Sequence, residues 1–327
     1  MTKPLLSLRE VVKTYTASGQ ELIANAGVSF DVYPSETVGV VGESGCGKST
    51  LAKLIVQLEQ PTGGEIYFDG EAVGHLKGKA LRNYRQAVQM VFQDPATSLN
   101  PKMRIFDLVA EPLKNYKRAK KSELKKRVAD LLDAVDLPLV LADRYPNQHS
   151  GGQRQRVNLA RALALHPKLV ICDESTSALD AIVQESVVQL LMHLQEKHNL
   201  TILFISHDLA LVHAIAHRVV VMYLGHVVEI LPSDCLTAYA SHPYTHVLMH
   251  AVIEPETPPG TNLMPHQLPE NTPELMQSHP ACPYYLSCDK RMPLCYTDKP
   301  ALRLRHEGHW VACHLEAAIQ GVPEERH

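Results

Sequence analysis

The stretch "TVGVVGESGCGKST", residues 37–50, decides the fold. Its first residues form an apolar, β-favouring run, which predicts a buried strand. The spacing G-x-x-x-x-G-K-[ST] follows directly and is satisfied by four residues, Gly42, Gly47, Lys48 and Ser49. Glycines at these places let successive backbone N–H groups point inward and cradle phosphate oxygens. The sequence from Lys48 onward is helical in pattern, so we predict a phosphate-binding strand–loop–helix whose helix dipole favours the anion.

Each position of this loop has an expected role. Lys48 should contact the β- and γ-phosphates of a nucleotide, and Ser49 should ligate Mg²⁺. The other residues expected to line the nucleotide are Glu43, Ser44, Gly45, Cys46 and Thr50. Because Cys46 lies beside a helix N-terminus and Lys48, we expect its thiol to have a lowered pKa and to be reactive when the loop is empty. The alternative is an inert small residue.

A magnesium shell also needs a carboxylate at the end of another buried strand. The run "KLVICDE" (168–174) supplies Asp173 for Mg²⁺ and Glu174 to polarise an attacking water. Two adjacent acids at an apolar strand end are costly unless a cation or hydrogen bonds compensate them. The run "TILFISHD" (201–208) ends a third strand of this kind, and its His207 is placed to sense a γ-phosphate.

The rest of the pattern predicts an α/β fold. Residues 5–12 and 28–33 alternate in the manner of strands in a small antiparallel sheet. Helical patterns dominate from about residue 96 to residue 165, and a further helix is expected over 180–197. Strands that alternate with helices around a buried sheet indicate a doubly wound α/β architecture.

Length and composition suggest two units. A chain of 327 residues exceeds one typical domain, and its composition, 45% hydrophobic and 20% charged, is that of a globular protein. The composition of the sequence changes around residue 231, and proline-rich and polar sequence dominates from residue 254, so the domain boundary is expected near 235–255. We therefore expect a domain over 1–235 and a C-terminal extension over 236–327 that contains a small, irregular, cysteine-rich part.

Several classes of protein are disfavoured. A net charge of −3 gives no case for nucleic-acid binding, although residues 114–127 form a basic stretch typical of a solvated helix face. The N-terminus has no apolar core of a signal peptide. The most apolar long stretch, 200–225, is interrupted by histidines, Asp208 and Arg218, so no transmembrane helix is expected. Seven cysteines without an export signal favour a reducing cytoplasm, and any membrane role is expected to come through a partner.

The stretch "HSGGQRQRVNLARAL" (149–163) settles the class by resemblance. Following a phosphate loop and preceding "VICDE", it resembles the signature of the ATP-binding cassette (ABC) family. The residues that open this helical stretch are Ser150, Gly151, Gly152 and Gln153. Their free N–H groups and the helix dipole can meet a γ-phosphate held by another subunit. The resemblance covers residues 5 to about 235. It implies a P-loop ATPase with a RecA-like core, an antiparallel β subdomain and a helical subdomain at roughly 96–165.

Further roles are implied by the same resemblance. Tyr15 corresponds to the aromatic residue that stacks on adenine. Gln93 in "VFQDP" corresponds to the glutamine that contacts Mg²⁺ or water and couples to the membrane partner. The loop "SALD" (177–180) corresponds to the segment that crosses the dimer interface, with Asp180 as its acid. His207 corresponds to the switch histidine.

Two residues of the chain depart from the family pattern, and a C-terminal stretch indicates which branch of the family it resembles. Ser175 stands where the family usually has proline, and His149 stands where it usually has leucine. Neither departure removes a catalytic group, so hydrolysis is still expected. The tail "SHPYTHVLMHAV" (241–252), followed by prolines and then cysteines, resembles ATPase subunits of dipeptide, oligopeptide and nickel importers. The likeness is closest to the F-type subunit of dipeptide and oligopeptide importers.

The resemblance implies an ATPase that drives uptake of peptides or similar small solutes from the cytoplasmic face of the cell membrane. Its implied partners are a second, different ATPase subunit, two permease subunits and an extracytoplasmic solute-binding protein. A nickel or metal-chelate importer is the nearest alternative. A soluble, non-transport ABC protein and a non-hydrolysing regulator are further ones. The chain has one phosphate loop and one signature, separated by roughly a hundred residues, which disfavours the two-cassette and coiled-coil members of the non-transport class.

Four cysteines occupy the last 46 residues: Cys282, Cys288, Cys295 and Cys313. No pair has the C-x₂-C spacing of common zinc modules, so spacing alone leaves zinc, an iron–sulfur cluster and free or disulfide-bonded cysteines open. A metal suits this proline-punctuated segment, which has few large apolar residues for a core. Similarly spaced cysteines in peptide-importer subunits are associated with a [4Fe-4S] cluster, so the resemblance favours the cluster, with Zn²⁺ as the alternative.

Overall fold

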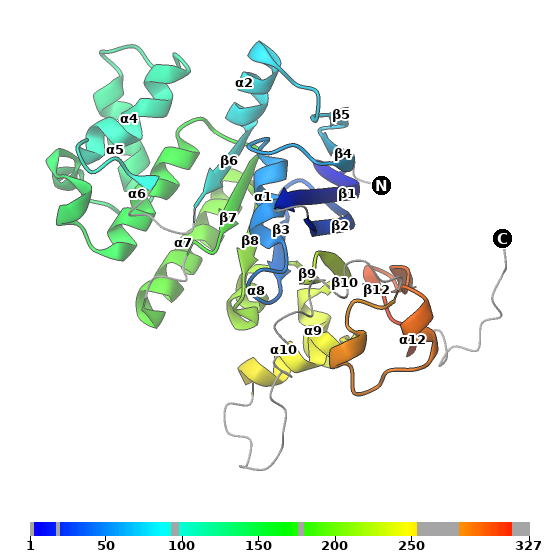
Figure 1. The fold of residues 1–327 in the computed structure, drawn as a ribbon. Coiled ribbons are helices and arrows are strands. Elements are labelled where there is room, and N and C mark those ends of the chain that lie inside the picture. Colours follow the sequence, from blue (N-terminus) through cyan, green and yellow to red (C-terminus); the bar gives the residue numbers. More distant parts are fainter. Residues whose placement is uncertain (1–2, 18–19, 93–97, 176–179, 254–280, 316–327) are drawn as a thin grey trace.

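The strand predicted before the glycine loop lies in the middle of the larger of two sheets (Figure 1). It is β3 (Thr37–Val41), which is buried along its whole length, and α1 (Lys48–Ile55) begins where the loop ends. The structure is a computed structural model that describes residues 3–17, 20–92, 98–175, 180–253 and 281–315.

Parallel strands flank β3 on both sides. The strands are β6 (Val88–Val91), β7 (Leu169–Asp173), β8 (Thr201–Ser206) and β9 (Arg218–Tyr223), and the sheet order is β11-β12-β10-β9-β3-β8-β7-β6. Strands covered on both faces are continuous apolar runs, which explains why "LVICD" and "TILFIS" could be predicted. Because carboxyl ends of parallel strands meet at one edge, the loops after β3, β7 and β8 come together there.

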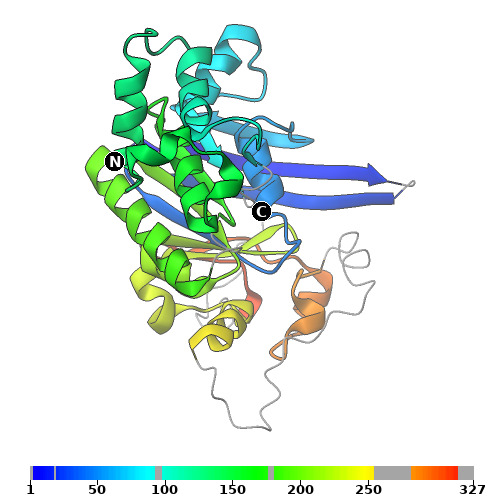
Figure 2. The same cartoon turned by 90° about the vertical axis from the view of Figure 1, so that its left-hand side faces the viewer.

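A smaller antiparallel sheet packs beside α1, as predicted. Its strands, in the order β2-β1-β4-β5, are β1 (Leu6–Ala17), β2 (Gln20–Val32), β4 (Gly63–Phe68) and β5 (Glu71–Ala72). Apolar side chains such as Leu6, Leu8 and Val28 form one buried cluster with Leu51 and Leu54 of α1. The hairpin of β1 and β2 extends away from the rest of the molecule (Figure 2).

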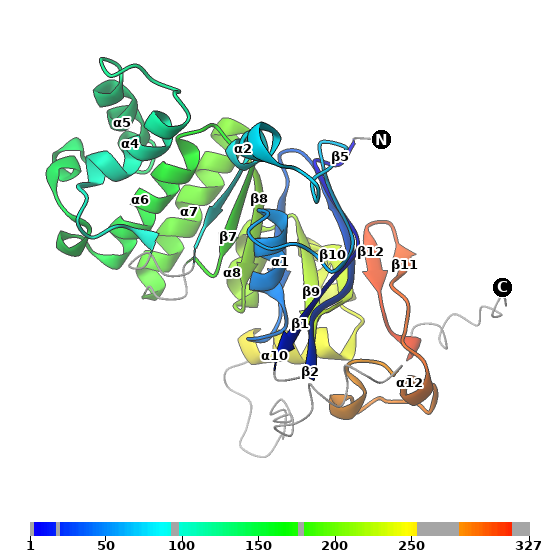
Figure 3. The same cartoon turned by 45° about the horizontal axis from the view of Figure 1, so that its top comes forward.

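The helices gather mainly on the side of β6 and β7 (Figures 1 and 3). They are α2 (Gly78–Ala87), α4 (Ile105–Asn115), α5 (Leu124–Asp133), the 3₁₀ turns η1 (Leu139–Asp143) and η2 (Pro146–Gln148), α6 (Gly151–Leu163), α7 (Ala181–His198) and α8 (Leu209–Ile215). Among the described helices, none is both long and apolar enough to cross a membrane. Helices α4 to α6 fall in the range predicted to be helical.

The C-terminal extension joins the core sheet. Strand β10 (His226–Pro232) returns antiparallel to β9, and β12 (His309–Val311) pairs with β10. The remaining elements are η3 (Ser233–Cys235), α9 (Leu236–Tyr239), α10 (Pro243–Ile253), η4 (Tyr285–Ser287), α12 (Leu294–Thr297) and β11 (Arg303–His306). The cysteine-rich part is thus more regular than expected, since two of its strands extend the main sheet.

Candidate active site

The glycine loop is held tightly between two strands. A Cβ atom at Gly47, whose φ is 101°, would lie 2.1 Å from the carbonyl oxygen of Ala24 in β2. A Cβ atom at Gly42 would lie 2.2 Å from the carbonyl oxygen of Met222 in β9. Side chains at these positions would collide with main chain rather than with movable groups, so the two motif glycines are required by close packing as well as by conformation.

Lys48 reaches back into the loop. Its ammonium is buried and donates hydrogen bonds to the carbonyl oxygens of Gly42 at 2.7 Å and Glu43 at 2.8 Å. A positive charge is therefore fixed inside the curve of the loop, where phosphates are expected. Its contact with β- and γ-phosphates stays a prediction.

Two of the predicted magnesium ligands meet. Ser49, at the start of α1, donates a hydrogen bond from Oγ to Oδ1 of Asp173, at the end of β7, over 3.0 Å. Burial raises the pKa of Asp173, and the bond from Ser49 opposes this shift. A hydroxyl and a carboxylate oxygen in contact are hard ligands of the kind Mg²⁺ prefers. A divalent cation here would also favour the ionised carboxylate, so the residues present fit the ion.

Glu174 and His207 are also brought together. They follow the adjacent parallel strands β7 and β8, and Oε1 of Glu174 lies 3.7 Å from Nδ1 of His207. The N–H of Glu174 donates to the carbonyl oxygen of Ile205, and Glu174 adopts a left-handed φ of 43°. Such a conformation costs on the order of 1 kcal/mol in a non-glycine residue and is often found at functional sites. The Glu174 side chain is 14% exposed and that of His207 is 55% exposed.

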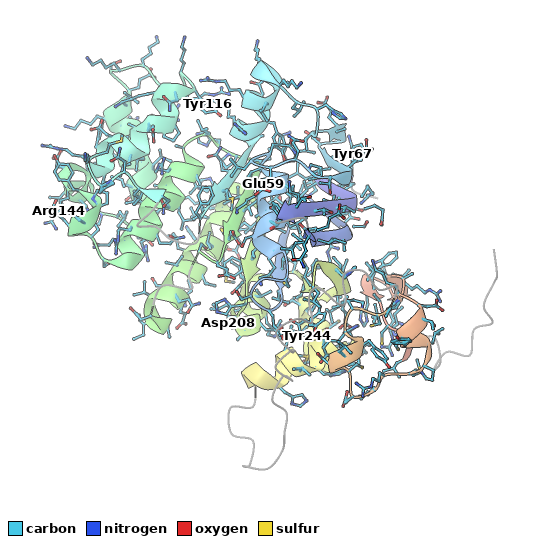
Figure 4. The ribbon with its side chains drawn as sticks, viewed as in Figure 1. Glu59, Tyr67, Tyr116, Arg144, Asp208 and Tyr244 are labelled. Atoms are coloured by element: carbon cyan, nitrogen blue, oxygen red, sulfur yellow. The ribbon has the colours of Figure 1, made fainter. Side chains whose placement is uncertain are left out.

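Asp208, directly after His207, caps the following helix, a role that was not assigned from the sequence. Its Oδ1 accepts hydrogen bonds from the N–H groups of Ala210 and Leu211, so it caps α8 (Figure 4). Its own N–H donates to Oγ of Ser206 at 3.0 Å. The sequence did contain a signal for this role, because an aspartate directly before an apolar helical run is a preferred N-cap.

The signature forms the predicted helix start. Ser150 caps α6: its Oγ accepts from the N–H of Gln153, and Oε1 of Gln153 accepts from the N–H of Ser150, both at 3.3 Å. This capping box leaves Ser150 exposed at the helix N-terminus. A Cβ at Gly152 would lie 2.4 Å from Cγ1 of Val183 in α7, so the glycine permits close helix packing.

Asp180 begins the neighbouring helix. Its Oδ1 accepts from the N–H of Val183 at 3.0 Å and caps α7. The three preceding residues of "SALD", at 177–179, lie outside the described residues, as does Gln93. Their expected roles at the dimer interface and the Mg²⁺ site stay predictions.

Tyr15 lies on β1 close to the end of the phosphate loop. Its phenol donates to Oε2 of Glu59 and also interacts with Thr50. The ammonium of Lys13 lies 4.9 Å from the centre of the Tyr15 ring. The ring is therefore near the nucleotide loop, and its stacking on adenine stays a prediction.

The expectation of a low pKa for Cys46 is wrong. The thiol is buried, and this burial raises its pKa even though Nζ of Lys48 lies 3.7 Å from Sγ. Loss of hydration of the thiolate outweighs attraction to the ammonium. Cys46 therefore has the character of a small buried residue.

The four tail cysteines lie near one another. Cys282, Cys288 and Cys295 are buried, and Cys282 interacts electrostatically with the other two and with Cys313. The N–H of Cys282 donates to the carbonyl oxygen of Cys295 at 2.9 Å. Burial raises the pKa of Cys282 to about 12. Nevertheless, within the described residues no three histidine, cysteine or acidic side chains are grouped so as to hold a metal ion, and the expected iron–sulfur cluster is not confirmed.

Two known family models match successive parts of the chain. A family model described as "ABC transporter" matches residues 26–177, and one described as "Oligopeptide/dipeptide transporter, C-terminal region" matches residues 228–295. The first match includes the phosphate loop and the signature. The second begins within β10 and ends at Cys295 of the cysteine segment.

Curated proteins that match most of the chain are also named as ATP-binding proteins of peptide transporters. The chain is 44% identical over 294 residues to a probable peptide ABC transporter ATP-binding protein of Sinorhizobium fredii, covering 89% of this chain and 82% of the relative. It is 45% identical over 258 residues to the oligopeptide transport ATP-binding protein OppF of Bacillus subtilis, covering 78% and 85%.

Among solved structures, the dimeric ATP-binding cassette MJ0796 bound to ADP and Pi superposes with a TM-score of 0.64 at 32% identity, covering 70% of this chain and 98% of that one. The fold described here thus resembles that of a known ATP-binding cassette. The chain belongs to the ATP-binding subunits of ABC transporters, in the branch with the oligopeptide/dipeptide transporter C-terminal region.

Proposed function

We propose that the chain binds Mg-ATP and hydrolyses it to drive import of dipeptides or oligopeptides. The observation that carries the proposal is the contact of Ser49 with Asp173 at 3.0 Å, directly beside Glu174. Two relatives named for peptide or oligopeptide transport, each matching most of this chain, support the substrate class.

The residues suggest how hydrolysis proceeds. The N–H groups of the loop and Lys48 hold the phosphates, while Mg²⁺, when bound by Ser49 and Asp173, would neutralise phosphate charge. Glu174 is close enough to the carboxyl edge of the sheet to orient a water toward the γ-phosphate and take up its proton. His207, 3.7 Å from Glu174, would keep that carboxylate in place and contact the phosphate.

A second ATPase subunit completes the site in this proposal. Ser150 is exposed at the N-terminus of α6, where free N–H groups favour an anion. A head-to-tail pair would place this helix end against the partner's phosphate loop. The similar cassette MJ0796 is a dimer in its structure with ADP and Pi, which supports pairing of two ATPase subunits. We further propose a heterodimer that works with two permease subunits and an extracytoplasmic solute-binding protein, bound at the cytoplasmic face of the membrane.

Uptake by the complete transporter tests this function. The chain, its partner ATPase, the permeases and the binding protein are placed in vesicles with a labelled oligopeptide. We expect the peptide to accumulate only with Mg-ATP on the side of the ATPase subunits, because hydrolysis drives the step. Accumulation of a nickel chelate instead of peptide would change the substrate class, and the absence of any ATP-dependent uptake would contradict the proposal.

We also propose that the tail cysteines hold a [4Fe-4S] cluster. The four thiols interact with one another and three of them are buried, which supports this proposal. The segment also has few large apolar residues to form a hydrophobic core, so a bound metal would help it to fold. The resemblance of the tail to peptide-importer subunits, whose similarly spaced cysteines are associated with such a cluster, favours it over zinc, which stays the alternative.

Metal analysis tests the cluster. Protein purified without oxygen should be brown and contain about four irons and four sulfides per chain. Colour should be lost in the variant Cys288→Ser and kept in Cys235→Ser, a matched change outside the cluster. One equivalent of zinc in colourless protein would replace the cluster with a structural zinc, and metal-free protein would contradict both versions.

A further inference from the structure

The C-terminal extension contacts the phosphate loop directly. Tyr244, in the first turn of α10, is only 1% exposed. Its phenolic oxygen accepts a hydrogen bond from the N–H of Glu43, the second residue of the loop motif, at 2.9 Å. Figure 4 shows Tyr244 below the core sheet, beside the cysteine-containing part of the extension.

Glu43 links this tyrosine to Lys48 of the phosphate loop. The carbonyl oxygen of Glu43 accepts a hydrogen bond from Nζ of Lys48 at 2.8 Å. The same residue is thus bonded to Tyr244 through its N–H and to Lys48 through its C=O. A shift of Tyr244 can therefore be transmitted through Glu43 alone to the ammonium of Lys48, which is expected to contact phosphate.

The Tyr244 ring belongs to a cluster of three tyrosines. Its centroid lies 4.7 Å from that of Tyr223, at the end of β9, and 5.4 Å from that of Tyr284. Tyr223 and Tyr284 stack edge to face at 5.0 Å. Because Tyr284 is two residues beyond Cys282, the cluster connects the cysteine segment to the sheet and the loop.

The backbone also fixes Tyr244. Nδ1 of buried His242 accepts a hydrogen bond from the N–H of Tyr244 at 3.1 Å. Burial lowers the pKa of His242 to about 4, so the ring is neutral near pH 7 and can act as an acceptor. The tyrosine is therefore held at its main chain, its ring and its hydroxyl.

We propose that Tyr244 is a positioning residue for the ATP site, through which the cysteine-containing extension and the phosphate loop are coupled. The inference rests on the ATPase function proposed above. Coupling between two sites is reciprocal: if order in the extension strengthens nucleotide binding, nucleotide must strengthen order in the extension by the same factor.

The variant Tyr244→Phe tests the role of the hydroxyl. Phenylalanine keeps the ring contacts but leaves the N–H of Glu43 without its buried acceptor. In the full-length chain we expect the Kd for Mg-ATP to rise about five- to tenfold. In the assembled transporter the KM for ATP should rise with it, while kcat at saturating ATP changes by less than about twofold, as for a loss of binding alone.

Tyr239→Phe is the matched control. This tyrosine is 57% exposed on α9 and lies outside the ring cluster, so Mg-ATP affinity should stay at the wild-type value. Equal Kd values for wild type and Tyr244→Phe would overturn the inference while leaving the ATPase function intact. Wild-type protein that fails to bind Mg-ATP would instead remove the function itself.

Hydrogen exchange provides a test that needs no variant. In the wild-type full chain, a non-hydrolysable ATP analogue with Mg²⁺ should slow exchange at residues 242–250 and 281–288, far in sequence from the loop. The slowing should disappear in Tyr244→Phe if that protein folds. Unchanged exchange in these two segments of the wild type on nucleotide binding would contradict the coupling.

Discussion

The variant Glu174→Gln should keep its affinity for Mg-ATP while turnover by the assembled transporter falls by on the order of 10²-fold or more. Glutamine retains the size of the side chain but cannot accept the proton of the attacking water. ATP should therefore bind and remain unhydrolysed between the paired subunits. Phosphate release and nucleotide binding, measured on the same preparation, separate the two effects.

Glu185→Gln is the matched control for this change. Glu185 is an exposed glutamate on α7, so the same loss of charge there should leave turnover unaltered. If Glu174→Gln in the fully assembled transporter released phosphate near the wild-type rate, another group would have to act as the base.

The second large effect is expected on stability, at Glu229 of β10. This carboxylate is fully buried and accepts hydrogen bonds from the N–H groups of Ser241 at 2.7 Å and His242 at 3.2 Å. Its Oε1 also lies 2.8 Å from Nε2 of His309 in β12. One side chain therefore joins the core sheet to the start of α10 and to the last strand.

Glu229→Ala should lower the free energy of unfolding by about 3 kcal/mol, because each buried donor left without an acceptor costs about 1–3 kcal/mol. Urea unfolding of the full chain measures the change, and hydrogen exchange at β12 shows whether the extension opens first. Glu307→Ala, an exposed glutamate in the β11–β12 hairpin, should change stability by less than about 0.5 kcal/mol. Equal unfolding midpoints for Glu229→Ala and wild type would show that this carboxylate does not hold the extension.

Local sequence was sufficient for the centre of the fold. Strands β3, β7 and β8 are largely apolar runs. Residues with recognisable chemistry lie at or after their ends: the glycine loop with Lys48 after β3, Asp173 at the end of β7 and His207 after β8. Parallel pairing then brings those ends together without further information. The capping box of Ser150 and Gln153 could likewise be read from adjacent positions.

Contacts between distant segments could not be predicted in this way. The bond from Glu43 to Tyr244 joins residues 201 positions apart, and nothing in either local sequence specifies the other. The pKa of Cys46 was misjudged for a related reason, since burial depends on the tertiary packing around the loop. The β9–β10 hairpin did leave a signal: Leu224 and Gly225 form its turn with positive φ.

Peptide-dependent ATP hydrolysis in vesicles tests the central claim most directly. The complete transporter, with its binding protein, is assayed for phosphate release in the presence and absence of oligopeptide. The proposed function predicts that peptide raises the rate and that label enters the vesicles in step with hydrolysis. Hydrolysis that proceeds at one rate regardless of peptide, with no label inside, would contradict a role of this chain in peptide import.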